Sequence, residues 1–308
     1  MSGPTAVVFA YHDVGVRCLE ALLSGGVRIP LVVTVPDDPR ENRWYASVAA
    51  IAADYRLECI APASAATPEL ASRVGALRPD FIFSFYYRSL LSPALLGSAR
   101  RGALNMHGSL LPKYRGRAPV NWAIVRGEHE TGATLHYMVE RADAGDIVDQ
   151  MSVPILVDDD ARAVFAKVTV AAEIILVRSL PALVAGSAPR RPQTVLPGEY
   201  FGRRTPEDGR IDWGRPAREI HDLVRAVAPP FPGAFAQIGG ERWEIHRTRA
   251  SDAAPPRPGA WLFGAGGAVL AACGGGGVLE LLEVANAQGP LERAQLARAL
   301  AQRPVPLA

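Results

Sequence analysis

The chain has 308 residues, 49% of them hydrophobic, so it can bury a sizeable core and is longer than most single domains. Its formal net charge of +2 does not indicate a polyanionic partner, and we expect no bound nucleic acid. The three cysteines are odd in number and far apart, which speaks against a disulfide framework and against a metal site.

The sequence suggests neither a signal peptide nor a membrane span. The N-terminus has no basic segment and no long apolar core, so it does not look like a signal peptide. No window reaches the roughly 18 uncharged apolar residues of a membrane span. We therefore expect a cytoplasmic protein without membrane insertion.

Strand-like and helical segments alternate through the first half of the chain. Residues 5–10, 29–35, 80–87 and 102–107 are short apolar runs typical of buried strands, while 16–26 and 44–55 have helical spacing. Alternation of this kind predicts an α/β domain with a Rossmann-like open, mostly parallel sheet. The first turn, "AYHDVG", lacks the glycines of a dinucleotide fingerprint, so we do not expect a nicotinamide cofactor.

The second half of the chain has a different pattern of apolar and polar residues. Residues 132–155 predict two strands around a turn at 144–145, and residues 158–186 predict a long amphipathic helix with acidic residues at its start. The proline-rich run 188–209 resembles a linker, and short apolar pieces separated by Pro and Gly follow it. We therefore predict a catalytic domain over 1–203 and a smaller, all-β, OB-like barrel over 204–308, with a hairpin turn at 274–277 and a short closing helix over 291–300.

The candidate site begins with Asn105 and His107 at the end of a predicted strand. Residues two apart in a strand share a face, so the amide and the imidazole can point to one place. An amide N–H beside a histidine can stabilise an oxyanion and move a proton near neutral pH. The same residues can also be a turn cap and an ordinary buried histidine.

A carboxylate near this pair would favour the charged form of the imidazole and fix its tautomer. Asp143 stands at the turn between the two later strands, and Asp146 is equally placed by position alone. Ser109 lies two residues beyond His107, but no nucleophile elbow surrounds it. The pattern therefore predicts direct transfer to a nucleophile that the substrate supplies.

Basic residues follow the candidate site and also occur near the domain junction. Lys113, Arg115 and Arg117 crowd the loop after His107 and could hold a phosphate or a carboxylate, or be a solvated loop. Arg203 and Arg204 stand where the linker ends.

The motif "NMHGSLLPKYRGRAPVNW", together with the later "RADAGD", resembles the signature of formyltransferases that use 10-formyltetrahydrofolate. The similarity extends over the chain, and "VVFAYHDVG", "FIFSFYYRSLL" and "FGRRTPEDGRIDW" resemble the UDP-4-amino-4-deoxy-L-arabinose formyltransferases of the ArnA type. That resemblance implies formyl transfer to the 4-amino group of the nucleotide sugar, a step of lipid A modification and polymyxin resistance.

The resemblance also implies residue roles. Asn105 would stabilise the transition state, His107 would donate the proton, and Asp143 would make the histidine more basic. The positions implied to contact folate are Ser89, Leu90, Leu91, Arg117, Val139, Glu140, Arg141, Ala142 and Asp143. We further expect that Arg203 or Arg204 meets the phosphates of the nucleotide sugar.

Two alternatives stay open on sequence grounds, methionyl-tRNA formyltransferase and a formyltransferase for another nucleotide-linked amino sugar. The tRNA enzymes usually have a basic C-terminal domain, whereas residues 201–308 here hold 13 Arg against 11 Asp and Glu. The bifunctional relatives continue into a nucleotide-sugar decarboxylase domain, and this sequence contains no such segment, so that activity is expected on a separate chain or a missing part.

Overall fold

The computed structural model describes residues 3–36, 42–194 and 200–307. Contacts between residues divide the chain into two units. The first unit comprises residues 1–119, 130–153 and 165–202, and the second comprises 120–129, 154–164 and 203–308. The second unit thus includes two short segments from the middle of the chain, so no single boundary separates the units along the sequence. The domain boundary at 203–204 stays a prediction.

A seven-stranded sheet with the order β3-β2-β1-β4-β5-β7-β8 forms the centre of the first unit. Strand β1 pairs in parallel with β2 and β4, β4 pairs in parallel with β5, and β7 runs antiparallel to β5. This arrangement confirms the predicted Rossmann-like, mostly parallel sheet. The strands are β1 Thr5–Ala10, β2 Arg28–Val33, β3 Cys59–Ile60, β4 Phe81–Phe85, β5 Gly102–His107, β7 Glu130–Tyr137 and β8 Ile147–Pro154.

Helices α1 to α5 connect these strands. They are α1 His12–Ser24, α2 Val48–Asp54, α3 Pro68–Leu77, α4 Pro93–Gly97 and α5 Pro119–Val125. Alternate strand residues such as Val7 and Leu31 pack with Leu70 of α3 and Leu95 of α4 in one buried cluster. Every second side chain of a strand points to this face, so α3 and α4 cover the same side of the sheet. Among them, only α1 and α2 were predicted.

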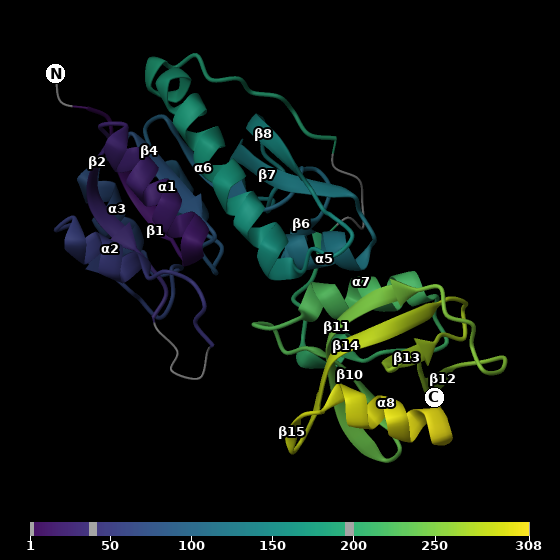
Figure 1. Cartoon of the computed structure of the whole chain (residues 1–308). Coiled ribbons are helices and arrows are strands. Elements are labelled where there is room, and N and C mark those ends of the chain that lie inside the picture. Colours follow the sequence, from purple (N-terminus) through teal and green to yellow (C-terminus); the bar gives the residue numbers. More distant parts are fainter. Residues whose placement is uncertain (1–2, 37–41, 195–199, 308) are drawn as a thin grey trace. The chain divides into compact units, whose positions relative to one another are not determined.

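The long helix α6, Ala161–Ala185, lies beside α1, and the two are seen in front of the sheet in Figure 1. Asp160 begins it as predicted, because its carboxylate accepts the Ala163 N–H at 2.7 Å. The predicted amphipathic pattern is wrong, since Val170 and Val177 are more than half exposed and the helix is apolar on its outer face as well. Length and composition would let α6 cross a membrane, but half of it is buried against the protein, as in the core helix of a soluble protein.

The second unit is built on an antiparallel sheet with the order β10-β11-β14-β13-β12-β16, which curls into half a barrel. Its strands are β10 Ala234–Ile238, β11 Glu241–Ser251, β12 Trp261–Ala265, β13 Ala268–Ala272, β14 Val278–Asn286, β15 Gly289–Pro290 and β16 Val305–Pro306. The predicted hairpin turn lies between β13 and β14. This sheet confirms the antiparallel β-fold that was predicted for the C-terminal part.

Helices also belong to this unit. Helix α8, Arg293–Gln302, packs closely on β12, because a Cβ added to Gly264 would lie 1.9 Å from the Ala297 carbonyl oxygen. Helix α7, Ala217–Val227, packs against β11, and a single 3₁₀ turn, Pro206–Gly209, precedes it. The short helix predicted over 291–300 is α8, whereas α7 was missed, although its apolar residues recur at helical spacing.

Candidate active site

Strand β5 positions the first two candidate side chains. In the sheet it lies between β4 and β7, and its residues Leu104 and Met106 are buried in the core. Asn105 and His107 alternate with these two residues along the strand, so their side chains both point to the opposite face of the sheet. His107 is 6% exposed, and Asn105 is partly exposed.

The imidazole of His107 is held from both sides. Its Nε2 lies 2.9 Å from the Tyr114 carbonyl oxygen, and because a carbonyl only accepts, Nε2 carries a hydrogen. Its Nδ1 lies 3.6 Å from Asp143 Oδ1. Nδ1 is therefore the nitrogen that can gain or lose a proton at the carboxylate side, while the loop carbonyl fixes the ring orientation.

The amide of Asn105 points toward the same carboxylate. Its Nδ2 lies 3.5 Å from Asp143 Oδ1 and 3.1 Å from His136 Nε2. The Nδ1 of His136 lies 2.8 Å from the Tyr137 carbonyl oxygen and so carries the hydrogen, which leaves Nε2 to accept from Asn105. The amide orientation of Asn105 is thereby set by a second histidine.

His136 was not among the predicted site residues. It lies on β7 directly opposite Asn105 and is 1% exposed. Nothing near it in the sequence marks it, because its place beside Asn105 depends on the register between β5 and β7. A histidine within a predicted strand was the only signal in the sequence.

Asp143 completes the group. The Gly116 N–H donates to its Oδ2 at 3.0 Å, and its Oδ1 faces His107 and, at 3.6 Å, His136 Nε2. Burial alone would raise the pKa of Asp143, but the His107 imidazole and the Gly116 N–H outweigh burial and hold that pKa well below its usual range. Asp143 is therefore an ionised carboxylate at neutral pH.

The turn that carries Asp143 is fixed through the backbone. Asp143 adopts φ +52°, and Gln193 Nε2 donates to the carbonyl oxygens of Asp143 at 3.2 Å and Gly145 at 2.6 Å. A Cβ on Gly145 would lie 2.0 Å from the Tyr137 carbonyl oxygen, so this position requires glycine. Asp146, the other candidate, instead accepts the Tyr137 N–H through its carbonyl oxygen.

The loop after β5 supports these groups. Ser109 is fully buried, and its hydroxyl donates to the Lys113 carbonyl oxygen at 2.6 Å, so it closes the loop. Arg115 is 3% exposed, and its Nε and Nη1 have no hydrogen-bond partner within the described part of the chain. Arg117 is exposed, and its guanidinium donates to the Arg88 carbonyl oxygen at 3.3 Å.

The other predicted contact residues lie in two surface loops of the first unit and at the start of the C-terminal segment. Ser89 and Leu90 are exposed after β4, whereas Leu91 packs on the core cluster. Val139, Glu140 and Arg141 are exposed after β7, and Ala142 is partly buried. In the second unit, Arg203 is exposed, while the Arg204 guanidinium lies 4.6 Å from the Trp122 ring centroid and donates to the Asp208 carbonyl oxygen at 2.8 Å.

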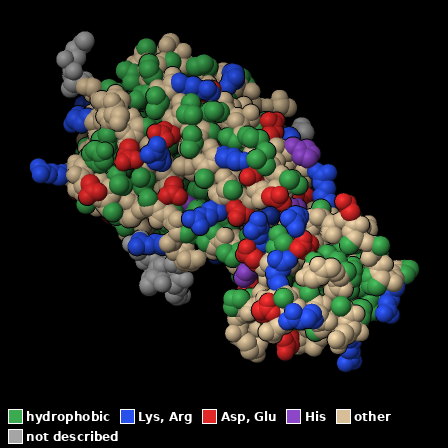
Figure 2. Space-filling model, viewed as in Figure 1, with side chains coloured by type: hydrophobic (Ala, Val, Ile, Leu, Met, Phe, Trp, Pro, Cys, Tyr) green, Lys and Arg blue, Asp and Glu red, His purple; other side chains and the backbone are tan. Residues whose placement is uncertain are grey.

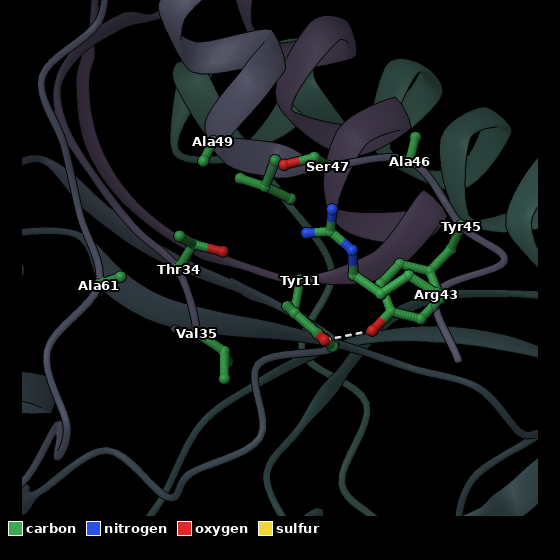
Figure 3. Close-up of a pocket in the computed structure, with 10 residues that line it drawn as sticks. Tyr11, Thr34, Val35, Arg43, Tyr45, Ala46, Ser47, Ala49 and Ala61 are labelled. Carbon is green, nitrogen blue, oxygen red and sulfur yellow. Dashed lines mark hydrogen bonds between the residues drawn. The ribbon is translucent and has the colours of Figure 1, made fainter. Parts of the chain in front are cut away.

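A small cavity of about 110 Å³ opens at the ends of β1 and β2. Figure 3 shows the Tyr11 and Tyr45 hydroxyls hydrogen-bonded to each other beside Arg43. Outside the residues drawn there, the His12 ring stacks on the Tyr45 ring with centroids 4.0 Å apart. Sequence reasoning did not find this cavity, whose remaining lining is Thr34, Val35, Ala46, Ser47, Val48, Ala49 and Ala61. Aromatic rings, hydroxyls and a guanidinium suit a ring compound with polar substituents.

Among the described residues, no group of three or more His, Cys, Asp or Glu side chains could hold a metal ion. The site consists of an amide, two imidazoles and an ionised carboxylate. Such a set can bind a developing oxyanion and move a proton without a covalent enzyme intermediate.

Comparison with known families gives the class of this enzyme. The formyl transferase family model matches residues 6–180, and the model of the formyl transferase C-terminal domain matches residues 203–299. The chain belongs to the formyl transferase family, and it is a formyltransferase.

Solved structures with the same fold include several formyltransferases. An N-formyltransferase from Helicobacter canadensis, in complex with folinic acid and dTDP-3-aminofucose, has a TM-score of 0.71 at 20% identity over 91% of this chain and 98% of that chain. The sugar 3N-formyl transferase WlaRD, with dTDP and 5-N-formyl-THF, has a TM-score of 0.71 at 19% identity over 95% and 99%. A 4-N formyltransferase from Francisella tularensis has a TM-score of 0.65 at 20% identity over 79% and 96%.

Proposed function

We propose that this formyltransferase transfers the formyl group of 10-formyltetrahydrofolate to the amino group of a nucleotide-linked amino sugar. The observation that carries the proposal is the convergence of Asn105 and His107 on one oxygen of Asp143, at 3.5 and 3.6 Å. The complexes of similar structures with folinic acid or 5-N-formyl-THF and dTDP sugars or dTDP support this choice of donor and acceptor.

In the proposed reaction the neutral sugar amine attacks the formyl carbon, and the formyl oxygen becomes negative. The Asn105 amide N–H and the protonated Nδ1 of His107 are the donors that would bind this oxygen. The C–N bond to the folate then breaks, the attacking nitrogen loses a proton, and the folate nitrogen gains one. His107 would relay that proton, and ionised Asp143 would stabilise the imidazolium that forms.

The folate would lie between the two exposed loops of the first unit. Leu90 is 72% exposed and Val139 is 47% exposed, so both offer apolar surface that an aromatic ligand could contact. Ser89, Leu91, Arg117 and residues 140–143 complete the proposed folate contacts. For the sugar phosphates we propose Arg203, because the Arg204 guanidinium is already engaged by Trp122 and Asp208.

The specific acceptor that we propose is the 4-amino group of UDP-4-amino-4-deoxy-L-arabinose, within lipid A modification in the cytoplasm. It depends on the sequence similarity to formyltransferases of the ArnA type. A different nucleotide-linked amino sugar is the second candidate, because similar structures include both a 3N-formyl and a 4-N formyltransferase. Residues 1–203 would be the catalytic domain.

A formyl-transfer assay tests the proposal directly. Purified protein and 10-formyltetrahydrofolate are incubated with UDP-4-amino-4-deoxy-L-arabinose, with a dTDP-3-amino sugar, or with initiator methionyl-tRNA, and formylated product is measured by mass spectrometry. We expect product with the UDP sugar. Product with only the dTDP sugar would correct the acceptor, and product with only the tRNA would overturn the sugar assignment.

A further inference from the structure

The outer face of α6 is apolar along most of its length. Val170 is 54% exposed, Ile174 is 40%, Val177 is 55% and Val184 is 37%. Pro181 is exposed between the last two. In Figure 2 hydrophobic side chains lie along the course of this helix.

A helix that covers a sheet normally turns a polar face to water. The inner face of α6 is apolar as expected, because Val168, Ala172 and Leu176 are fully buried. Packing within the first unit therefore does not explain why the outer face is apolar. Exposed stripes of this kind on soluble proteins usually mark a binding surface.

The spacing of the exposed residues is that of a coiled-coil seam. Residues 170, 174, 177, 181 and 184 follow each other at intervals of four, three, four and three, as the a and d positions of a heptad do. With Ile174 and Pro181 at a, and Val170, Val177 and Val184 at d, the seam spans two heptads.

Charges of opposite sign border this seam. Glu173 precedes the a residue Ile174 and occupies g, and Arg178 follows the d residue Val177 and occupies e. Their side chains are 29% and 47% exposed. In a parallel pair of helices, g of one chain faces e of the next heptad in the other chain, so Glu173 would face Arg178 twice across the two-fold axis.

Both charged residues can accept this second contact. Glu173 Oε2 pairs with Arg17 at 2.7 Å, and Arg178 donates through Nε and Nη2 to Asp149 and through Nη2 to the Gln150 carbonyl oxygen. A guanidinium has five donors and a carboxylate about four acceptor positions, so these partners saturate neither residue. The charge pattern is therefore complementary to a second copy of the same helix in parallel orientation.

We propose that α6 is the interface of a two-fold dimer in which the helices of two copies run parallel along residues 170–184. The seam is short, and the flanking surface must add area to approach the roughly 800 Å² per partner of a typical interface. We therefore expect a reversible dimer with a dissociation constant on the order of micromolar. This inference does not depend on the substrate.

Sedimentation velocity over a concentration series of the full chain tests the proposal. The native protein should shift from monomer to dimer with concentration, and Ile174→Glu should stay monomeric because it buries a charge at the centre of the seam. Leu77→Glu is the matched control, because Leu77 is 36% exposed on α3, and it should dimerise normally. Unchanged melting temperature and turnover would show that the variants are folded.

Charge reversal tests the orientation. Glu173→Arg alone and Arg178→Glu alone should each weaken the dimer about 3- to 10-fold, since each places like charges opposite one another. The double reversal should recover the native affinity. Both intramolecular pairs, with Arg17 and Asp149, are lost in that variant, so recovery can come only from contacts between copies.

Three outcomes would overturn the proposal. They are a native protein that is monomeric at every concentration, a dimer that Ile174→Glu does not affect, and a double reversal without recovery, which would exclude the parallel orientation. Co-sedimentation with phosphatidylglycerol vesicles, lost in Ile174→Glu and without self-association, would instead assign this face to a lipid surface.

Discussion

At the residue scale, His107 has one nitrogen tied to the Tyr114 carbonyl oxygen and the other turned to Asp143. Replacing it by alanine removes the proton relay but none of the proposed folate contacts. We expect His107→Ala to lower turnover by about 10² to 10⁴ while the folate dissociation constant changes little. Steady-state kinetics and folate titration measure both, with His246→Ala as a control. Near-normal turnover would remove His107 from the mechanism.

The ionised state of Asp143 makes a prediction about pH. Its pKa lies lower in the folded protein than in the unfolded chain, where a carboxyl has a value of about 3.9. Asp143 therefore contributes stability above that value and loses the contribution as pH falls below it toward the folded pKa. In urea unfolding, the difference in stability between native protein and Asp143→Asn should narrow below about pH 4. A difference that is constant with pH would contradict the pKa direction.

Tyr86 is a strained and unsatisfied neighbour of the site. It has φ +56°, and its hydroxyl is buried without a hydrogen-bond partner in the described part of the chain. It packs on Gly108, where an added Cβ would lie 1.8 Å from the hydroxyl oxygen. Tyr86→Phe should therefore raise the free energy of unfolding by about 1 kcal/mol, with Tyr87→Phe as the control. Thermal unfolding checks this, and a loss of stability would show that the hydroxyl has a partner.

At the element scale, the close approach of β7 and β8 depends on Gly132. A Cβ at this position would lie 2.1 Å from the Met151 carbonyl oxygen, which is backbone and cannot move aside. Gly132→Ala should lower stability by about 1–3 kcal/mol. Gly75 in α3 is the matched position, with nothing within 4 Å of an added Cβ, and Gly75→Ala should instead raise stability by about 0.5–1 kcal/mol. Melting temperatures shifted in the same direction would contradict this packing argument.

At the scale of the whole molecule, the second unit uses segments from the middle of the chain. Buried Arg225 donates through Nη1 to the carbonyl oxygens of Leu156 at 3.1 Å and Asp159 at 2.9 Å. The His221 ring meets the Val157 carbonyl oxygen at 2.9 Å through Nε2. Residues 203–308 alone lack all three acceptors, so part of their structure depends on residues 154–164.

A fragment of residues 203–308 should accordingly be less stable than the same unit in the full chain by about 3 kcal/mol or more, since hydrogen bonds of charged groups are worth about 1.5–3 kcal/mol each. Urea unfolding followed by circular dichroism measures this. The matched control is the full chain cleaved between Gly202 and Arg203, which retains residues 154–164 and should keep its stability. Equal stability of fragment and cleaved chain would show that these segments contribute little.

Features that depend on local periodicity could be predicted from the residues alone. Apolar runs of strand length predicted β1, β4 and β5, and the spacing of two placed Asn105 and His107 on one side of β5 because alternation is a property of the strand alone. Helices α3 to α5 and α7 were missed, because short amphipathic segments between prolines give a weak periodic signal.

The contacts between residues that are distant in sequence could be seen only in the folded structure. The antiparallel register of β5 and β7 set His136 against Asn105, the turn after β7 selected Asp143 over Asp146, and the loop after β5 delivered the Tyr114 carbonyl oxygen to His107. The exposure of apolar residues on the outer face of α6 also follows from the packing of the helix, which the sequence alone does not reveal. Contacts of this kind join residues far apart in sequence, so they depend on how the whole chain packs and not on local conformational preference.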